Sequence, residues 1–254
     1  MAEQRFNCTL CGQCCRGWIP LTLDDALANA GRFPLAMVWT PVRPGSRAFD
    51  LTTRLGTTVQ LRNHKQVAVL IAPTAYIPPS FPCPALTADN LCGIQGDKPQ
   101  RCRTMPFYPY REENDQADIL VPRKGWACDT SAAAPVIYRD KTIIDREAFD
   151  REREALTAQA PSLRAYAETM LKQNAALTDY LTKAAQNPVA GHFAVNFSSY
   201  LRLNRSYDLI AFAKAQHPVL TAFANRTEKT PELADYHTYY KESAAELSWF
   251  AQRS

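Results

Sequence analysis

The hydrophobic pattern divides the chain into two parts of different character. In the first part, short apolar runs alternate with turns rich in proline and glycine, and three of the runs have the length of strands: residues 57–61, 66–72 and 119–121. In the second part, apolar residues recur at helical spacing. We therefore predict an α+β protein, with a small irregular domain of short strands over residues 1–140 and an all-helical domain over residues 141–254.

Capping and breaking residues bound the predicted helices. Thr22 and Asp25 have the spacing of a capping box, so a helix is predicted to begin there, and Gly31 is predicted to end it. A longer helix is predicted further on, with Pro161 near its start and Pro188 beyond its end.

Two more helices are predicted near the C-terminus. One covers residues 207–216 and is expected to break at His217-Pro218, because proline removes a backbone donor. The last begins with Thr230 as its cap and Pro231 at its first helical position. Apolar residues then recur along one face almost to the end of the chain.

Composition indicates an ordinary folded protein. The 254 residues are 46% hydrophobic, which is enough for a core. The 29 Lys and Arg residues against 25 Asp and Glu residues give a net charge of +4, and the basic residues are dispersed, so we expect no nucleic-acid partner. No run approaches the roughly eighteen apolar residues of a membrane span, and the N-terminus lacks the apolar core of an export signal. We expect a cytoplasmic location and no membrane partner.

The candidate chemistry lies in eight cysteines. Four of them fall within eight residues near the N-terminus, and the full set is Cys8, Cys11, Cys14, Cys15, Cys83, Cys92, Cys102 and Cys128. In a reducing compartment, clustered thiols bind metal more often than they form disulfides, although disulfides and a Cys-x-x-Cys redox pair remain alternatives. A tight turn at Gly12 can direct the first three sulfurs at one centre. The side chain of Cys15 points to the other side, so it is either a ligand of a second centre or a bridge.

Eight thiols permit two four-thiolate centres, each holding zinc or a [4Fe–4S] cluster. Such a centre is negatively charged, and burying it requires compensation. Arg16, Arg101 and Arg103 each lie next to a cysteine. We predict that they neutralise sulfur charge or bind an anionic ligand; the alternative is that they are solvated surface side chains.

The cysteine motifs resemble the CxxCxxCC family, the YkgJ-type proteins described as having a zinc- or iron-chelating domain. The resemblance covers roughly residues 6–130 and consists of the N-terminal cysteine cluster, Ile19-Pro20-Leu21-Thr22, Cys83-Pro84-x-Leu86, Cys92-x-Ile94 and Pro99-x-x-Cys102-Arg103-x-x-Pro106-Phe107. Many relatives have Pro-Gly after the last cysteine, where this chain has Asp129-Thr130, so Cys128 is the least certain ligand of the set.

The resemblance implies that all eight cysteines are metal ligands and favours iron–sulfur over zinc. A more distant resemblance, to the flagellin lysine-N-methylase, implies cluster-dependent group transfer such as protein-lysine methylation, with a protein as substrate or partner. Against this, the sequence has no Gly-x-Gly-x-x-Gly or other recognisable S-adenosylmethionine loop. The alternative is a non-catalytic protein in which zinc stabilises a binding or structural domain.

Overall fold

The computed structural model describes residues 3–62, 64–186 and 191–253, and its fold is α+β, as predicted. Its strands are β1 (Glu3–Arg5), β2 (Ile19–Pro20), β3 (Leu35–Val42), β4 (Thr57–Gln60), β5 (Gln66–Ala75), β6 (Val136–Arg139), β7 (Thr142–Ile143) and β8 (Phe193–Asn196). Its α-helices are α1 (Leu23–Ala28), α2 (Phe49–Leu55), α3 (Gln100–Thr104), α4 (Glu147–Gln173), α5 (Ala175–Gln186), α6 (Ser198–Leu203), α7 (Leu209–Thr227) and α8 (Ala234–Ala251). Three short 3-10 helices, Glu113–Asp115, Ala117–Leu120 and Pro231–Leu233, complete the described elements.

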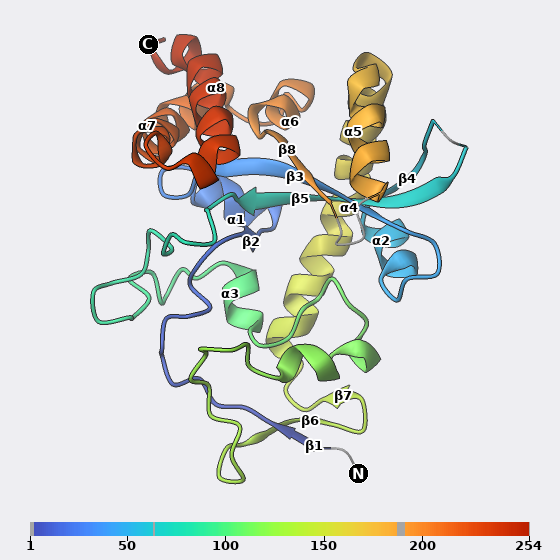
Figure 1. The fold of residues 1–254 in the computed structure, drawn as a ribbon, viewed down its shortest axis with the longest axis vertical. Coiled ribbons are helices and arrows are strands. Elements are labelled where there is room, and N and C mark those ends of the chain that lie inside the picture. The colour runs from blue at the N-terminus through green and yellow to red at the C-terminus, as the bar shows by residue number, and fades with distance from the viewer. Residues whose placement is uncertain (1–2, 63, 187–190, 254) are drawn as a thin grey trace.

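The larger sheet is antiparallel and runs in the order β2-β5-β3-β8, with β4 also paired to β5. Strands β3 and β5 are its longest, and they pair from Leu35 opposite Ala75 to Val42 opposite Ala68. Almost every residue of β3 and β5 is buried, because helices cover both faces. Figure 1 shows α5 to α8 on one side of this sheet and α1 and α2 on the other.

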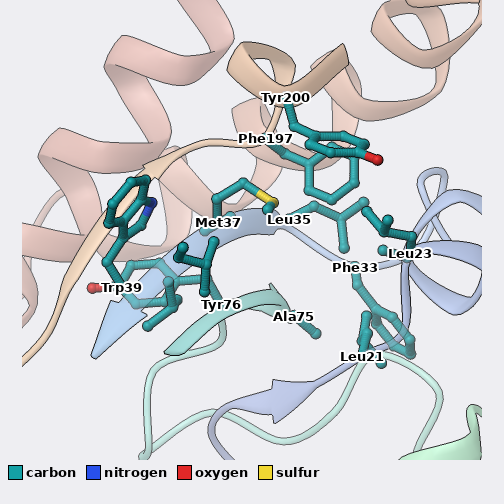
Figure 2. Packing of buried hydrophobic residues seen from close by; sticks show 14 of the residues in the cluster. Leu21, Leu23, Phe33, Leu35, Met37, Trp39, Ala75, Tyr76, Phe197 and Tyr200 are labelled. Atoms are coloured by element: carbon teal, nitrogen blue, oxygen red, sulfur yellow. The ribbon is translucent and has the colours of Figure 1, made fainter. Parts of the chain in front are cut away.

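The main core lies between this sheet and its covering helices. Figure 2 shows Leu35 and Met37 of β3 beside Phe197 and Tyr200, which come from the segment that follows β8. Trp39 is fully buried. Strand β8 pairs with β3, so the second part of the chain completes the sheet that the first part begins.

A smaller sheet, in the order β1-β6-β7, lies near the N-terminus. Its residues Tyr138 and Ile143 form a second buried cluster with Phe107, Leu120 and Phe149. Helix α4 starts beside this sheet and extends to the larger one, as Figure 1 shows. The loops that contain Cys8 to Cys15 and Cys83 to Cys92 lie between β2 and α1 on one side and the smaller sheet on the other (Figure 1).

Two of the predicted strands are confirmed and one prediction is wrong. Strands β4 and β5 correspond to residues 57–61 and 66–72. Residues 119–121 do not form a strand, because Ile119 belongs to the 3-10 helix Ala117–Leu120. The cause is Gln116, whose fully buried amide bonds the carbonyl oxygens of three residues, Tyr108, Arg111 and Glu112, and fixes a compact turn there.

The predicted helix starts and stops are only partly right. The Thr22 cap is confirmed, since its hydroxyl accepts a 3.1 Å bond from the amide of Asp25, but the helix ends at Ala28 rather than Gly31. Thr230 makes no capping bond, and Pro231 begins a 3-10 turn that precedes α8. Pro188 lies outside the described residues.

Two prolines expected near helix boundaries lie inside helices instead. Helix α4 begins at Glu147 and passes through Pro161, and α7 passes through Pro218. Proline costs a helix one hydrogen bond, but a continuous buried face on each helix outweighs that loss. The description of residues 141–254 as all-helical is also wrong, because β7 and β8 lie there.

Candidate metal-binding site

The N-terminal cysteine turn is shaped by two residues with left-handed backbone. Leu10 has φ 58° and Gly12 has φ 71°, and the amide of Cys15 donates a 3.1 Å bond to the carbonyl of Gly12. A Cβ atom on Gly12 would lie 3.0 Å from the side-chain oxygen of Asn90. Glycine is therefore needed both for the turn and for its close approach to the loop that holds Cys92.

Backbone bonds place Cys8 near Cys128, although 120 positions separate them. Asn7 and Asp129 exchange amide-to-carbonyl bonds of 2.8 and 3.0 Å. The hydroxyl of Thr9 donates a 2.8 Å bond to the carbonyl of Ala127. The residues on both sides of Cys8 thus contact the residues on both sides of Cys128.

A second set of bonds connects Cys15 to the loop that follows β5. The amide of Cys83 donates a 2.8 Å bond to the carbonyl of Cys15. The amide of Leu86 bonds the carbonyl of Cys83, and Leu86 forms an isolated bridge with Cys92. Backbone contacts therefore link Cys15 to Cys83 and, through Leu86, to Cys92.

Cys102 lies in α3, which packs against α4 and is hydrogen-bonded at its start to α1. The side-chain carboxylate of Asp25 accepts a 2.9 Å bond from the amide of Gln100 at the start of α3. Burial and then the charge of Cys83, with smaller effects of Cys92 and Cys14, raise the pKa of Cys102 to about 12, although the charge of Arg101 opposes them. Cys102 therefore lies within electrostatic range of the same cysteines that contact Cys15.

The electrostatic interactions divide the eight thiols into two groups. Burial and then the charges of Cys11, Cys8 and Cys14 raise the pKa of Cys128, and these four cysteines form the first thiol group. The second thiol group is Cys15, Cys83, Cys92 and Cys102. A hydrogen bond with Cys14 lowers the pKa of Cys15, although burial and the charges of the other three members oppose this effect.

The adjacent residues Cys14 and Cys15 join the two groups. The hydrogen bond between their sulfur atoms raises the pKa of Cys14, and burial adds to this effect. The pKa of Cys11 is instead lowered, because the backbone amides of Gln13 and Ala127 donate to its sulfur. The sequence predicts that these two side chains point to opposite sides, and their hydrogen bond shows that they do not.

The eight cysteines have the donor chemistry of a thiolate metal site. All eight are free thiols. Among the residues that the structure describes, however, no three His, Cys, Asp or Glu side chains are arranged to hold a metal ion. The thiols of each group are therefore neighbours whose donor type fits zinc or an iron–sulfur cluster, without a formed coordination sphere.

The three arginines expected beside the cysteines lie in different environments. Arg16 and Arg103 are exposed, and they bond the backbone carbonyls of Ser80 and of Lys98 and Gly96. Arg101 is buried against Glu152 of α4. The charge of Arg101 lowers the pKa of Cys102.

Sequence reasoning missed two other cations near the thiols. Lys98 lowers the pKa of Cys14, and Arg32 lowers the pKa of Cys83, in each case as a minor effect opposing burial. Lys98 could have been found, because it precedes the Pro99-x-x-Cys102 motif. No pattern pointed to Arg32, which the turn after α1 brings to Cys83.

Within the described residues, no helix is both long enough and apolar enough to span a membrane.

Comparison with known proteins found no matching family model, no matching curated protein and no matching solved structure. The candidate site is therefore defined by the residues and contacts of this chain.

Proposed function

We propose that the protein binds metal through its eight cysteines, with one centre in each thiol group and iron–sulfur favoured over zinc. The observation that supports this most strongly is the set of backbone bonds around the thiols. Asn7 with Asp129, and Cys15 with Cys83, bring segments from distant parts of the sequence together at the cysteines.

The donor set favours a four-cysteine centre. Four thiolates hold either zinc or a [4Fe–4S] cluster, and no histidine is needed. His64 lies in the turn between β4 and β5, and His237 bonds the carbonyl of Ala224 in α7. These two histidines therefore lie in other parts of the fold than the cysteine loops. The preference for iron rests on this donor set and on the resemblance to the CxxCxxCC family.

The chain also supplies charge to stabilise the thiolates. The positive charges of Arg101, Lys98 and Arg32 each lower the pKa of a cysteine. Backbone amides do the same for Cys11. A metal binds the thiolate and not the thiol, so these groups oppose the effect of burial, which still leaves the pKa of Cys14, Cys83 and Cys102 raised.

A non-catalytic role for the metal is a second candidate. Residues 76–99 contain Cys83 and Cys92 but have no helix or strand beyond isolated bridges. Long irregular loops in a folded domain generally have a function or an added restraint, and a metal ion would provide that restraint here. In the catalytic alternative, the cluster would serve group transfer such as protein-lysine methylation, with a protein as substrate.

Metal identity is tested on the full chain purified without oxygen. Absorption near roughly 400 nm, with iron and acid-labile sulfide in equal amounts, is the result expected for clusters. A colourless protein with stoichiometric zinc would support the structural role, and a protein with no bound metal would overturn the proposal. Binding of S-adenosylmethionine by the cluster form would separate the catalytic alternative from the structural one.

A further inference from the structure

A buried ion pair joins the helix that contains Cys102 to the longest helix of the protein. Arg101 of α3 and Glu152 of α4 lie 3.6 Å apart, measured from Nη1 to Oε1. Their side chains are only 6% and 2% exposed. Charged side chains are almost never this buried unless they are paired, so each requires the other.

Other contacts of Arg101 fix its position between the two helices. Its second amino group donates to the carbonyl of Phe107, and its guanidinium lies 5.2 Å from the ring centre of Tyr108. One turn further along α3, the hydroxyl of Thr104 donates a 3.1 Å bond to the carbonyl of Ala148 in α4. Helix α3 has only five residues, so these contacts set the placement of the whole helix.

Burying the charges of Arg101 and Glu152 costs free energy that an apolar contact between the two helices would not. Arg101 Nη1 and Glu152 Oε2 are buried and lack hydrogen-bond partners among the described residues. Apolar residues of similar volume often stabilise such a place as well or better than a buried ion pair does. An apolar contact would not, however, direct a positive charge to a defined position beside the next residue, Cys102.

We propose that Glu152 is a positioning residue for Cys102: it holds Arg101, and with it α3, so that the Cys102 thiolate can join Cys15, Cys83 and Cys92 around a metal. This inference rests on the proposed metal-binding function. It assigns a role to a residue of the second part of the chain, which contains no cysteine. Residues behind metal ligands act in this way, and losing one typically weakens metal binding about 10–100-fold.

The test is the alkylation rate of each cysteine in the full chain, measured by peptide mass spectrometry after purification without oxygen and brief treatment with iodoacetamide. In the unaltered protein, all eight cysteines are expected to react slowly because metal covers them. In Glu152→Gln, Cys102 is expected to react about tenfold faster or more. The rates of Cys8, Cys11 and Cys128 in the first thiol group should not change. General destabilisation would instead expose all eight cysteines together.

Two further variants keep the test decisive. Glu154→Gln changes an exposed carboxylate on the same helix and should leave every rate unchanged. The double variant Arg101→Met/Glu152→Leu leaves no unpaired buried charge, so it should fold even where Glu152→Gln does not, and it should also expose Cys102. Protection of Cys102 in both folded variants, equal to that in the unaltered protein, would overturn this inference alone. Fast reaction of all eight cysteines in the unaltered protein would overturn the proposed function, and this inference with it.

Discussion

The amide of Cys83 donates a 2.8 Å hydrogen bond to the carbonyl oxygen of Cys15. This bond joins the N-terminal cysteine turn to the loop after β5, which otherwise has little regular structure. The neighbouring Cys14 acts through its charge on Cys128 of the first thiol group and, as a minor effect, on Cys102 of the second. One turn of chain thus takes part in two groups of thiols.

Single serine substitutions should remove the two centres independently. Cys8→Ser is expected to lower bound metal to about half by disabling the first thiol group, and Cys15→Ser to do the same through the second, because a four-thiolate site needs all its ligands. Metal analysis of each full-length variant measures this. Gln13→Ser, an exposed position within the same turn, is the control that should retain all the metal. Complete metal loss in both cysteine variants would indicate one shared centre.

Gln216 of α7 should be important for stability, because its buried amide joins α7 to the turn before β3. It accepts a 2.6 Å bond from the amide of Leu35 and donates to the carbonyls of Ala30 and Phe33 at 2.5 and 2.9 Å. Gln216→Ala leaves these three groups unpaired, and we expect it to lower the free energy of unfolding by about 2–4 kcal/mol. Urea unfolding measures this loss, with exposed Gln173→Ala as the control. An equal stability for the two variants would contradict the assigned role.

Gly56 should not tolerate a side chain, because strand β5 passes close to it. A Cβ atom there would lie 2.0 Å from the carbonyl oxygen of Val69 and 3.0 Å from that of Thr52. We expect Gly56→Ala to lower the free energy of unfolding by about 3 kcal/mol, since backbone must move to make room. Gly96→Ala, at a position with no atom within 4 Å, is the matched control. Thermal unfolding of both variants compares them, and an unchanged melting temperature for Gly56→Ala would refute the close packing.

Asp25 should make stability depend on pH. Burial raises its pKa above the ordinary 3.8, so the folded protein keeps this proton to a higher pH than the unfolded chain does. Ionisation of Asp25 therefore reduces stability as the pH rises from 3.8 through the folded-state pKa. In Asp25→Asn the amide oxygen can still accept the bond from Gln100, but this loss disappears.

The measurement is urea unfolding of both proteins at several values between about pH 4 and pH 7. The variant's stability relative to the unaltered protein should increase with pH across that window. Asp24→Asn, the exposed neighbour, controls for the lost charge at the helix start. A relative stability that stays constant or declines would show that Asp25 ionises without cost.

The sequence predicted what local patterns determine. Strands β4 and β5 follow from their short apolar runs, and the start of α1 follows from Thr22, whose side chain bonds the backbone three residues on. Helix boundaries were wrongly predicted near Pro161 and Pro218, which lie inside helices. Those helices continue because their buried faces pack against partners elsewhere in the chain, and local sequence does not show these partners. Strand β8 was missed for the same reason, since its pairing with β3 is a contact between distant residues.

The candidate site shows the same limit. The tight spacing at the N-terminus indicated a metal site. The second group was inferred from an expected opposite direction of Cys15, but its sulfur is hydrogen-bonded to that of Cys14. Which later cysteine joins which group depends on contacts such as that between Asn7 and Asp129, and no spacing rule predicts these. The burial of Arg101 against Glu152 was equally hidden, because its partner lies fifty positions away.

The central claim is that two groups of four cysteines each hold a metal centre. Native mass spectrometry of the full chain, purified without oxygen, tests this most directly because it counts the bound atoms on each molecule. Two clusters predict about eight iron and eight sulfide per chain, and two structural sites predict about two zinc. A chain that has only the mass of its amino acids, with all eight thiols free, would contradict the claim.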